Sequence, residues 1–268
     1  YLFGENDSPA EIKKEQSETQ EDFVARLEAQ ADEGDLRVQK ALAYIYLYGK
    51  SEFPVDYEKA FKYYEMAANQ GDATALNNLG SLYFNGIGVA VNYHKAIELF
   101  EKAAQAGSSE AALNLGFIYL SGRNASNNAI HAVELFKISA AKNNVIAKFM
   151  LGYAHYRGFG VAKDLNKGAA LVKESADADF DEAQYILGYM YLNGFGIVKN
   201  YDNARKYMQY AMRQGNMSAI MVLADEEASG KNLMKTNCVL FCSMSKRISG
   251  WGICGTFPCG KCCARFFG

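Results

Sequence analysis

The sequence predicts an all-α protein, a solenoid of stacked helix-turn-helix repeats that are each 36 residues long. This prediction rests on three sets of residues that recur at that interval. They are a Leu-Gly pair (Leu79-Gly80, Leu115-Gly116, Leu151-Gly152, Leu187-Gly188), a glycine (Gly86, Gly122, Gly158, Gly194) and an alanine (Ala60, Ala96, Ala132, Ala204, with Gly168 in the fourth place). A fixed period in this range is typical of one stacked supersecondary unit, an architecture that favours binding over catalysis.

Each repeat is predicted to hold two helices. In residues 72–107 the apolar side chains Ala75, Leu79 and Leu82 recur at helical spacing on a first helix, and a second helix from Ala96 onward has the same rhythm. Alanine and glycine are frequent on both apolar faces, and small residues let two helix backbones approach closely. The two helices are therefore expected to form a tight antiparallel hairpin.

Polar residues mark where the helices begin and end. Second helices are expected to begin at an Asp or Asn, whose side chain caps free N–H groups: Asp56, Asn92, Asn128, Asp164 and Asn200. They are expected to end at residue types that tolerate the left-handed conformation: Gly71, Gly107, Asn143, Asp179 and Gly215. The following residues Asp72, Ser108, Asn144 and Asn216 can cap the next first helix, whereas Phe180 interrupts this column.

These signals divide the chain. Residues 1–20 are predicted to be a polar, disordered leader and residues 21–34 a partial N-terminal repeat helix. The repeats are placed at 35–70, 72–106, 108–142, 144–178 and 180–214, and a degenerate sixth begins before residue 230. Residues 231–250 are predicted to hold a degenerate repeat helix, within which 235–249 could pair with the first helix of that sixth repeat after a shortened connection. Residues 251–268 form a cysteine-rich tail that has lost the repeat character.

Composition excludes several classes of protein. The net charge is −2 and no basic stripe is visible, so no nucleic-acid partner is expected. No apolar run reaches the roughly 18 residues that a membrane span needs. The chain begins at Tyr1 without a Met, which is expected of either a processed mature form or a fragment. We therefore favour an exported location, in the bacterial periplasm, outside the cell or in the endoplasmic-reticulum lumen, over the cytoplasm.

The repeats resemble the Sel1-like repeat family, a tetratricopeptide-like group of α-solenoids. The second repeat carries the resemblance throughout, with Ala75, Leu79-Gly80, Tyr83, Gly86 and Gly88-Val89, and then Ala103-Ala104 and Gly107. The resemblance covers roughly residues 35–230. It implies a right-handed superhelix that works as a protein-interaction scaffold or adaptor, and relatives include adaptors of endoplasmic-reticulum degradation and bacterial envelope or secreted proteins.

The chain departs from the family pattern at several places. Ala43 stands where other repeats have the glycine of Leu-Gly, residues 123–126 replace a Gly-Val turn, and His155 replaces a tyrosine. A cysteine-rich subgroup of the family has a regularly spaced Cys pair in each repeat. No repeat here has one, so the penicillin-binding behaviour of that subgroup is not carried over.

The candidate binding residues lie on the first helices. The position after Leu-Gly reads Tyr44, Ser81, Phe117, Tyr153 and Tyr189, and it is expected to face away from the core of its own repeat. Together with helical neighbours it predicts an aromatic trough on the concave face: Tyr44, Phe117, Leu120, Phe149, Tyr153, Tyr156, Tyr185, Tyr189 and Leu192. Aromatic side chains offer a large contact area and a polar end, as peptide-binding surfaces do. The same side chains could instead be buried between adjacent repeats.

No catalytic or cofactor site is predicted. The Gly-x-Gly turns follow helices rather than strands, so they are turn glycines and not phosphate loops. His94, His131 and His155 lie in separate repeats, away from any ligand set. Ser243 to Lys246 has the S-x-x-K form without its companion motifs. The chain is accordingly predicted to be a non-enzyme that binds another protein or peptide. The alternative is an exported enzyme or binder of cell-wall fragments, with the β-lactamase-like activity claimed for the cysteine-rich relatives.

All cysteines lie near the C-terminal end of the sequence: Cys238, Cys242, Cys254, Cys259, Cys262 and Cys263. Three interpretations stay open. Cys238, Cys242, Cys259 and Cys262 could hold a structural zinc ion, although their spacing is irregular for a zinc ribbon. An even count also allows up to three disulfides that staple a terminal cap in an oxidising compartment. The third interpretation is a disordered or aberrant C-terminus. No metal or cofactor is expected elsewhere.

Overall fold

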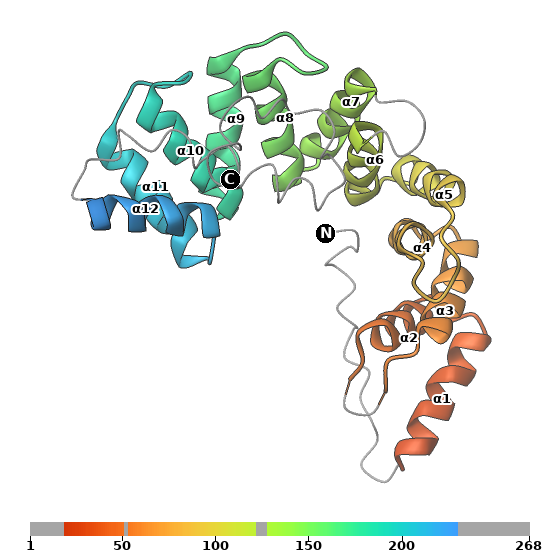
Figure 1. Ribbon diagram of the computed structural model, residues 1–268. Helices are drawn as coiled ribbons and strands as arrows, with labels where there is room; N and C mark the ends of the chain where they lie inside the picture. Colours follow the sequence, from red (N-terminus) through yellow and green to blue (C-terminus); the bar gives the residue numbers. More distant parts are fainter. Residues whose placement is uncertain (1–18, 51–52, 122–127, 230–268) are drawn as a thin grey trace, which may run out of the picture. The chain divides into compact units, whose positions relative to one another are not determined.

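The computed structural model describes residues 19–50, 53–121 and 128–229, the last five of them by backbone alone, and most of these residues lie in twelve helices (Figure 1). The helices are α1 (Gln20–Asp32), α2 (Leu36–Tyr48), α3 (Tyr57–Asn69), α4 (Ala73–Asn85), α5 (Tyr93–Gln105), α6 (Ser109–Ser121), α7 (Ala129–Ala141), α8 (Val145–Arg157), α9 (Leu165–Asp177), α10 (Asp181–Asn193), α11 (Tyr201–Arg213) and α12 (Met217–Ser229). The predicted all-α solenoid of paired helices is confirmed.

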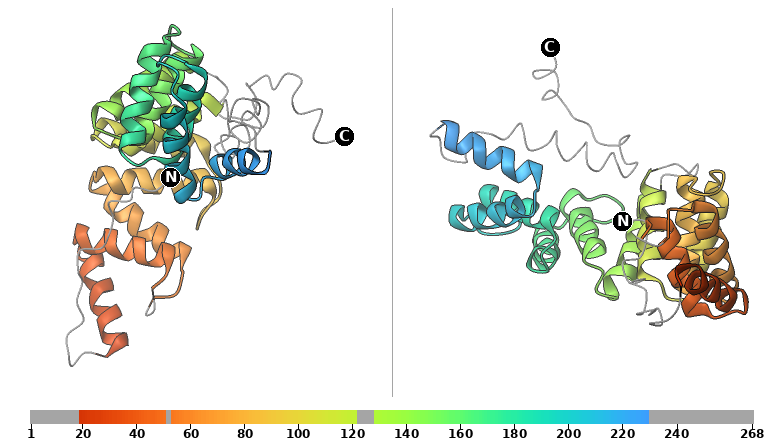
Figure 2. Two further views of the ribbon diagram at one scale, coloured as in Figure 1. Left: turned by 90° about the vertical axis from the view of Figure 1, so that its left-hand side faces the viewer. Right: turned by 90° about the horizontal axis from the view of Figure 1, so that it is seen from below.

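The helices alternate in kind along the chain. The even-numbered helices from α2 to α12 are the first helices of successive repeats, and α3, α5, α7, α9 and α11 are the second helices. Two compact units are present, and the division between Leu115 and Gly116 falls inside α6. The first unit holds α1 to α5 and the start of α6, and the second holds the rest of α6 and α7 to α12. The alternation within each unit can be followed in Figures 1 and 2.

The predicted capping residues start the helices as expected. Asp164 Oδ1 accepts a hydrogen bond of 2.9 Å from the backbone N–H of Lys167, and the same bond recurs at Asp56, Asn92, Asn128 and Asn200. Asp72, Ser108, Asn144 and Asn216 cap first helices in the same way. Phe180 begins α10 without a side-chain cap. Each such bond satisfies an N–H group that has no partner within the helix.

The predicted left-handed positions are also confirmed. Asn143 and Asp179 have φ values of 63° and 61°, and they are the non-glycine residues with positive φ among the described residues. Gly71, Gly107 and Gly215 occupy the equivalent places with φ between 82° and 100°. Asparagine and aspartate are the non-glycine residues that adopt this conformation most readily. The chain therefore reverses direction at the same point of each of these repeats.

The small residues of the Leu-Gly pair bring the two helices of a repeat together. A Cβ atom built on Gly80 would lie 3.0 Å from the ring of Phe100, and one on Gly188 would lie 2.8 Å from Cγ of Met208. The partner side chains fill the space that the missing side chain leaves, and both Phe100 and Met208 are fully buried. The predicted tight hairpin follows from this contact.

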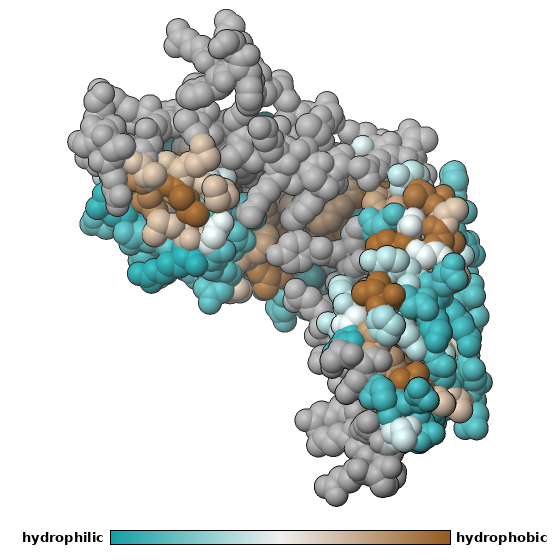
Figure 3. Space-filling view, turned by 60° about the horizontal axis from the view of Figure 1, so that its bottom comes forward, coloured by the Kyte–Doolittle hydropathy of each residue, from teal (hydrophilic) through white to brown (hydrophobic). Residues whose placement is uncertain are grey.

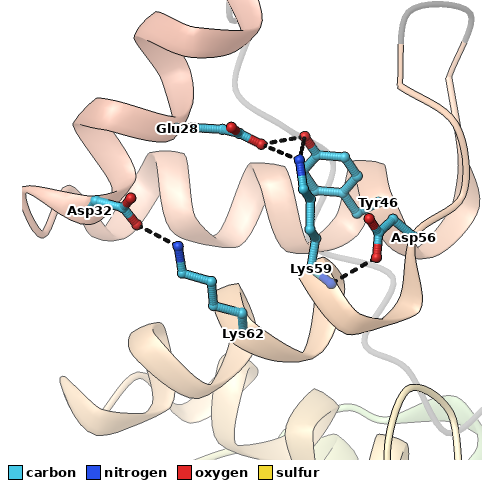
Figure 4. A network of polar contacts seen from close by, with 6 residues as sticks. All are labelled: Glu28, Asp32, Tyr46, Asp56, Lys59 and Lys62. Carbon is cyan, nitrogen blue, oxygen red and sulfur yellow. Dashed lines mark hydrogen bonds and ion pairs between the residues drawn. The ribbon is translucent and has the colours of Figure 1, made fainter.

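Helix α1 is fastened to the first full repeat by a polar network (Figure 4). The Tyr46 hydroxyl donates to Glu28 Oε1 at 2.6 Å, and Lys59 Nζ lies 2.7 Å from the same oxygen. Lys62 Nζ lies 2.8 Å from Asp32 Oδ1. Burial opposes the ionisation of Glu28, but the hydrogen bonds from Lys59 and Tyr46 outweigh it and lower the pKa of the carboxyl. The network joins three consecutive helices, α1, α2 and α3.

Candidate interaction surface

Six aromatic side chains gather on two first helices of the second unit, α8 and α10, and on the turns that end them. We call them the aromatic cluster: Phe149, Tyr153, Tyr156, Phe159, Tyr189 and Phe195. Tyr153 is central on α8, with ring centroids 6.2 Å from Phe149, 6.2 Å from Tyr156 and 6.1 Å from Phe159. Phe195 lies 5.8 Å from both Tyr156 and Tyr189, which joins α8 to α10. These distances suit the tilted packing that aromatic rings prefer.

Two members of the aromatic cluster come from turns. Gly158 ends α8 in the left-handed conformation, and the N–H groups of Gly158 and Phe159 both bond to the carbonyl of Ala154. Gly194 and Phe195 repeat this arrangement on the carbonyl of Met190. An apolar residue directly after such a glycine commonly packs back on the helix that it ends. Sequence reasoning missed both phenylalanines, although each stands between the two glycines of a Gly-x-Gly turn.

The predicted trough residues differ in how far their side chains are exposed. Leu120, Phe149, Tyr153, Tyr185 and Leu192 are buried, with 1–8% of their surface exposed. Tyr44, Phe117, Tyr156 and Tyr189 are half-buried, as are Phe159 and Phe195. The buried members fill space between helices, and Phe149 packs edge-on against Phe180 at 5.4 Å. The half-buried members are the ones whose rings can also touch another molecule, and that role stays a prediction.

The tyrosine hydroxyls of the aromatic cluster stay neutral at physiological pH. Burial raises the pKa of Tyr156 to about 12, and the neighbouring Tyr189 adds to the effect. Burial also raises the pKa of Tyr189 and of Tyr153, where Arg157 acts in the opposite direction. A neutral phenol can both donate and accept a hydrogen bond. The surface therefore combines apolar rings with uncharged polar groups.

The equivalent positions of the first unit have a different character. Ser81 and Asn77 are buried on α4. Asn114 Nδ2 on α6 donates to Asn77 Oδ1 at 2.9 Å, and Ser81 Oγ donates to the Asn77 carbonyl. Buried polar side chains need such partners. The bond between Asn114 and Asn77 connects neighbouring first helices, and the bond of Ser81 lies within α4. The predicted column is aromatic again at Tyr44, whose ring lies 4.7 Å from Tyr48.

The three histidines belong to no metal-binding group among the described residues. Among the described residues, no three His, Cys, Asp or Glu side chains lie together as a metal site would require. His94 is exposed, His131 packs edge-on against Tyr119 at 4.5 Å, and His155 is buried with Nδ1 3.4 Å from the Ala162 carbonyl oxygen. The six cysteines and the Ser243–Lys246 motif lie outside the described residues. No described helix is both long and apolar enough to cross a membrane.

A family model for the Sel1 repeat matches the chain five times in succession, at residues 37–72, 73–108, 109–144, 145–180 and 181–216. The chain belongs to the Sel1 repeat family. The matches tile the chain without a gap from the start of α2 to the cap of α12. Sel1 repeat proteins typically serve as protein-interaction scaffolds and are generally not enzymes. No curated protein sequence matches this chain significantly.

Solved structures of Sel1 repeat proteins are similar in fold. A Sel1 repeat protein from Oxalobacter formigenes has a TM-score of 0.74 at 24% identity, and the match covers 87% of this chain and 93% of that one. The protective antigen c5321 of uropathogenic Escherichia coli has a TM-score of 0.68 at 26% identity, with 86% of this chain covered. The present chain spans about half of that antigen, 49% of its length.

The departures from the Sel1 pattern have local explanations. Ala43 takes the place of the Leu-Gly glycine and is fully buried, so one methyl group is accommodated in the first hairpin. His155 takes the place of a tyrosine and is also buried. Residues 123–126 lie outside the described residues.

Proposed function

We propose that this Sel1 repeat protein is an adaptor that binds a partner protein through a peptide segment on the concave face of the solenoid. The observation that carries the proposal is the aromatic cluster of the second unit. In it Tyr156, Tyr189 and Phe195 are half-buried and packed together, and the half-buried Phe159 packs against Tyr153. Rigid aromatic side chains lose little conformational entropy on binding and supply most of the binding energy in many interfaces.

The chemistry of the aromatic cluster favours an extended segment with apolar side chains. The rings offer contact area, and the neutral hydroxyls of Tyr156 and Tyr189 can bond to backbone groups of the segment. The hydroxyls are uncharged at physiological pH, since burial raises their pKa values above the ordinary tyrosine value, so they offer no ionic partner to a charged ligand. Rings that are already packed against one another need little rearrangement to bind, which reduces the entropic cost.

The test is a selection from a random peptide library displayed on phage, with the full chain as bait. Enriched peptides are synthesised and titrated against the wild type and against Tyr156→Ala and Tyr189→Ala. We expect each substitution to weaken binding by about tenfold or more, because a central aromatic anchor contributes over 1.4 kcal/mol.

Tyr210→Ala is the matched control. Tyr210 is 37% exposed and lies on α11, a second helix, so its loss should leave the affinity unchanged. Circular dichroism checks that all variants keep the helical content of the wild type. Enriched peptides that bind the Tyr156→Ala and Tyr189→Ala proteins as tightly as the wild type would contradict the proposal, and so would a selection that yields no binder.

A further inference from the structure

The last described helix, α12, leaves uncovered a face that other first helices bury. Ala224 occupies the position of the Leu-Gly glycine and is exposed. Its counterparts Ala43, Gly80, Gly116, Gly152 and Gly188 are all buried. In those repeats the second helix covers this position, as the contact between Gly80 and Phe100 shows. Helix α12 therefore presents a pairing face that none of the described helices covers.

Two methionines extend this uncovered face. Met221 is 47% exposed, whereas its counterparts Leu113, Phe149 and Tyr185 are 1–4% exposed. Met212 on α11 is 37% exposed, whereas its counterparts Ala68, Ala140 and Ala176 are buried and Ala104 is half-buried. We call Met212, Met221 and Ala224 the C-terminal edge. Figure 3 shows apolar residues gathered at the end of the second unit where α12 lies. Terminal repeats of a solenoid need a cap that shields such an edge from water.

We propose that residues 237–249 of this same chain cover the C-terminal edge as the second helix of a sixth repeat. The repeat register carries the assignment. Thr236 stands 36 residues after the N-cap Asn200, and threonine can cap a helix in the same way. Leu240 stands 36 residues after Ala204, and Met244 stands 36 residues after Met208.

The columns that Leu240 and Met244 join are buried in every described repeat. One contains Ala60, Ala96, Ala132, Gly168 and Ala204, and the other contains Tyr64, Phe100, Phe136, Val172 and Met208. Ile248 falls 36 residues after Met212, in the column of Ala68, Ala104, Ala140 and Ala176. Arg247 departs from its column of alanines and serines, and terminal repeats of a solenoid commonly differ from internal ones.

The connecting segment has the length that the register requires. Gly230 to Thr236 corresponds residue for residue to Gly194 to Asn200, which joins α10 to α11. No shortened connection is therefore needed.

The same register puts Cys238 and Cys242 in two columns that are exposed in every described repeat. These columns contain Glu58 and Lys62 in the first repeat and Asp202 and Lys206 in the fifth. In the proposed helix both cysteines are therefore expected on the exposed side, away from the repeat core.

The register supplies a pair of matched variants for the test, Leu240→Asp and Cys242→Asp in the full chain with reductant present. The measurement is hydrogen exchange of the α12 amides. We expect Leu240→Asp to speed exchange in α12 by about tenfold or more, because a charge at a buried position opens the helix pair. Cys242→Asp, two residues away on the exposed face, should leave exchange unchanged.

Two outcomes would overturn the proposal. Equal exchange of α12 in the wild type and both variants would mean that this segment does not cover the edge. A protection of α12 that rises with protein concentration would mean that a second copy of the chain covers it. Exchange of α8 to α10 is followed in the same experiment, and unchanged protection there shows that Leu240→Asp has not unfolded the rest of the second unit. Met244→Asp provides an independent repeat of the buried-position test.

Discussion

At the scale of single residues, the turn glycines constrain the structure most tightly. Gly196 follows the aromatic cluster residue Phe195 and has a φ of 69°. A Cβ atom on Gly196 would lie 1.9 Å from the carbonyl oxygen of Leu165, so the turn is in direct contact with the start of α9. Gly215 also has a positive φ, of 83°, but has open space around it. An alanine at Gly215 would add backbone strain alone, whereas an alanine at Gly196 would add both backbone strain and a steric clash.

We expect Gly196→Ala to lower the free energy of unfolding by about 3 kcal/mol or more, because it adds a clash with backbone to the strain of a left-handed alanine. Gly215→Ala should cost only about 1 kcal/mol, from the strain alone. Thermal unfolding followed by circular dichroism measures both. Equal shifts of Tm in the two variants would show that the contact with Leu165 is not rigid in solution.

At the scale of elements, helix caps and core packing compete at one position. Every other first helix from α2 to α12 begins after an Asp, Asn or Ser with a side-chain cap, but α10 begins after Phe180. Phe180 is 9% exposed and packs against Phe149, beneath the aromatic cluster. A cap contributes about 1 kcal/mol, whereas the burial of a phenylalanine contributes about 3 kcal/mol or more. Packing therefore outweighs capping at this position.

The variant Phe180→Asn restores the cap and removes the ring. We expect a net loss of about 2 kcal/mol in stability, measured as a lower Tm, together with weaker binding of any peptide selected on the aromatic cluster. Asp164→Ala, which removes a cap without touching the core, should cost about 1 kcal/mol and leave binding unchanged. A Phe180→Asn protein more stable than the wild type would mean that the missing cap dominates.

At the scale of the whole molecule, buried tyrosines make stability depend on alkaline pH. Burial, with the Glu28 carboxylate, raises the pKa of Tyr46 to about 12, and burial raises that of Tyr156 to about 12 as well. The pKa values of Tyr63 and Tyr207 are also raised, chiefly by burial. These residues are distributed over both units, so we expect both units to lose stability at alkaline pH.

The direction of the effect follows from linkage. A raised pKa means that the folded state holds the proton more tightly, so the stabilisation is complete below the usual tyrosine pKa of 10 and is lost as pH rises towards 12. We expect helicity at 222 nm to fall between pH 10 and 12 together with a steep rise in tyrosinate absorbance at 295 nm. Tyr46→Phe should move the transition to higher pH. Tyrosines that ionise near pH 10 while helicity is retained would contradict this.

Recurrence along the chain was enough to predict the solenoid, because caps, left-handed turns and small contact residues act locally and repeat at 36 residues. Asp164 and Asn143 show this, since a cap or a turn depends on neighbours a few residues away. The residues of the predicted trough lie on the first helices, and their role in binding stays a prediction. The pattern could not say which of their side chains are accessible.

Accessibility depends on the neighbouring repeat. Tyr153 and Tyr189 hold the same place in their repeats, yet Tyr153 is buried and Tyr189 is half-buried. Phe159 and Phe195 enter the aromatic cluster only because their turns fold back over the helices that they end. Burial is set largely by side chains of other helices, such as Phe100 against Gly80 and Phe180 against Phe149, whereas caps and turns are set within one helical turn. For this physical reason the fold can be predicted from the residues alone, and the composition of its surface follows only from how the repeats pack.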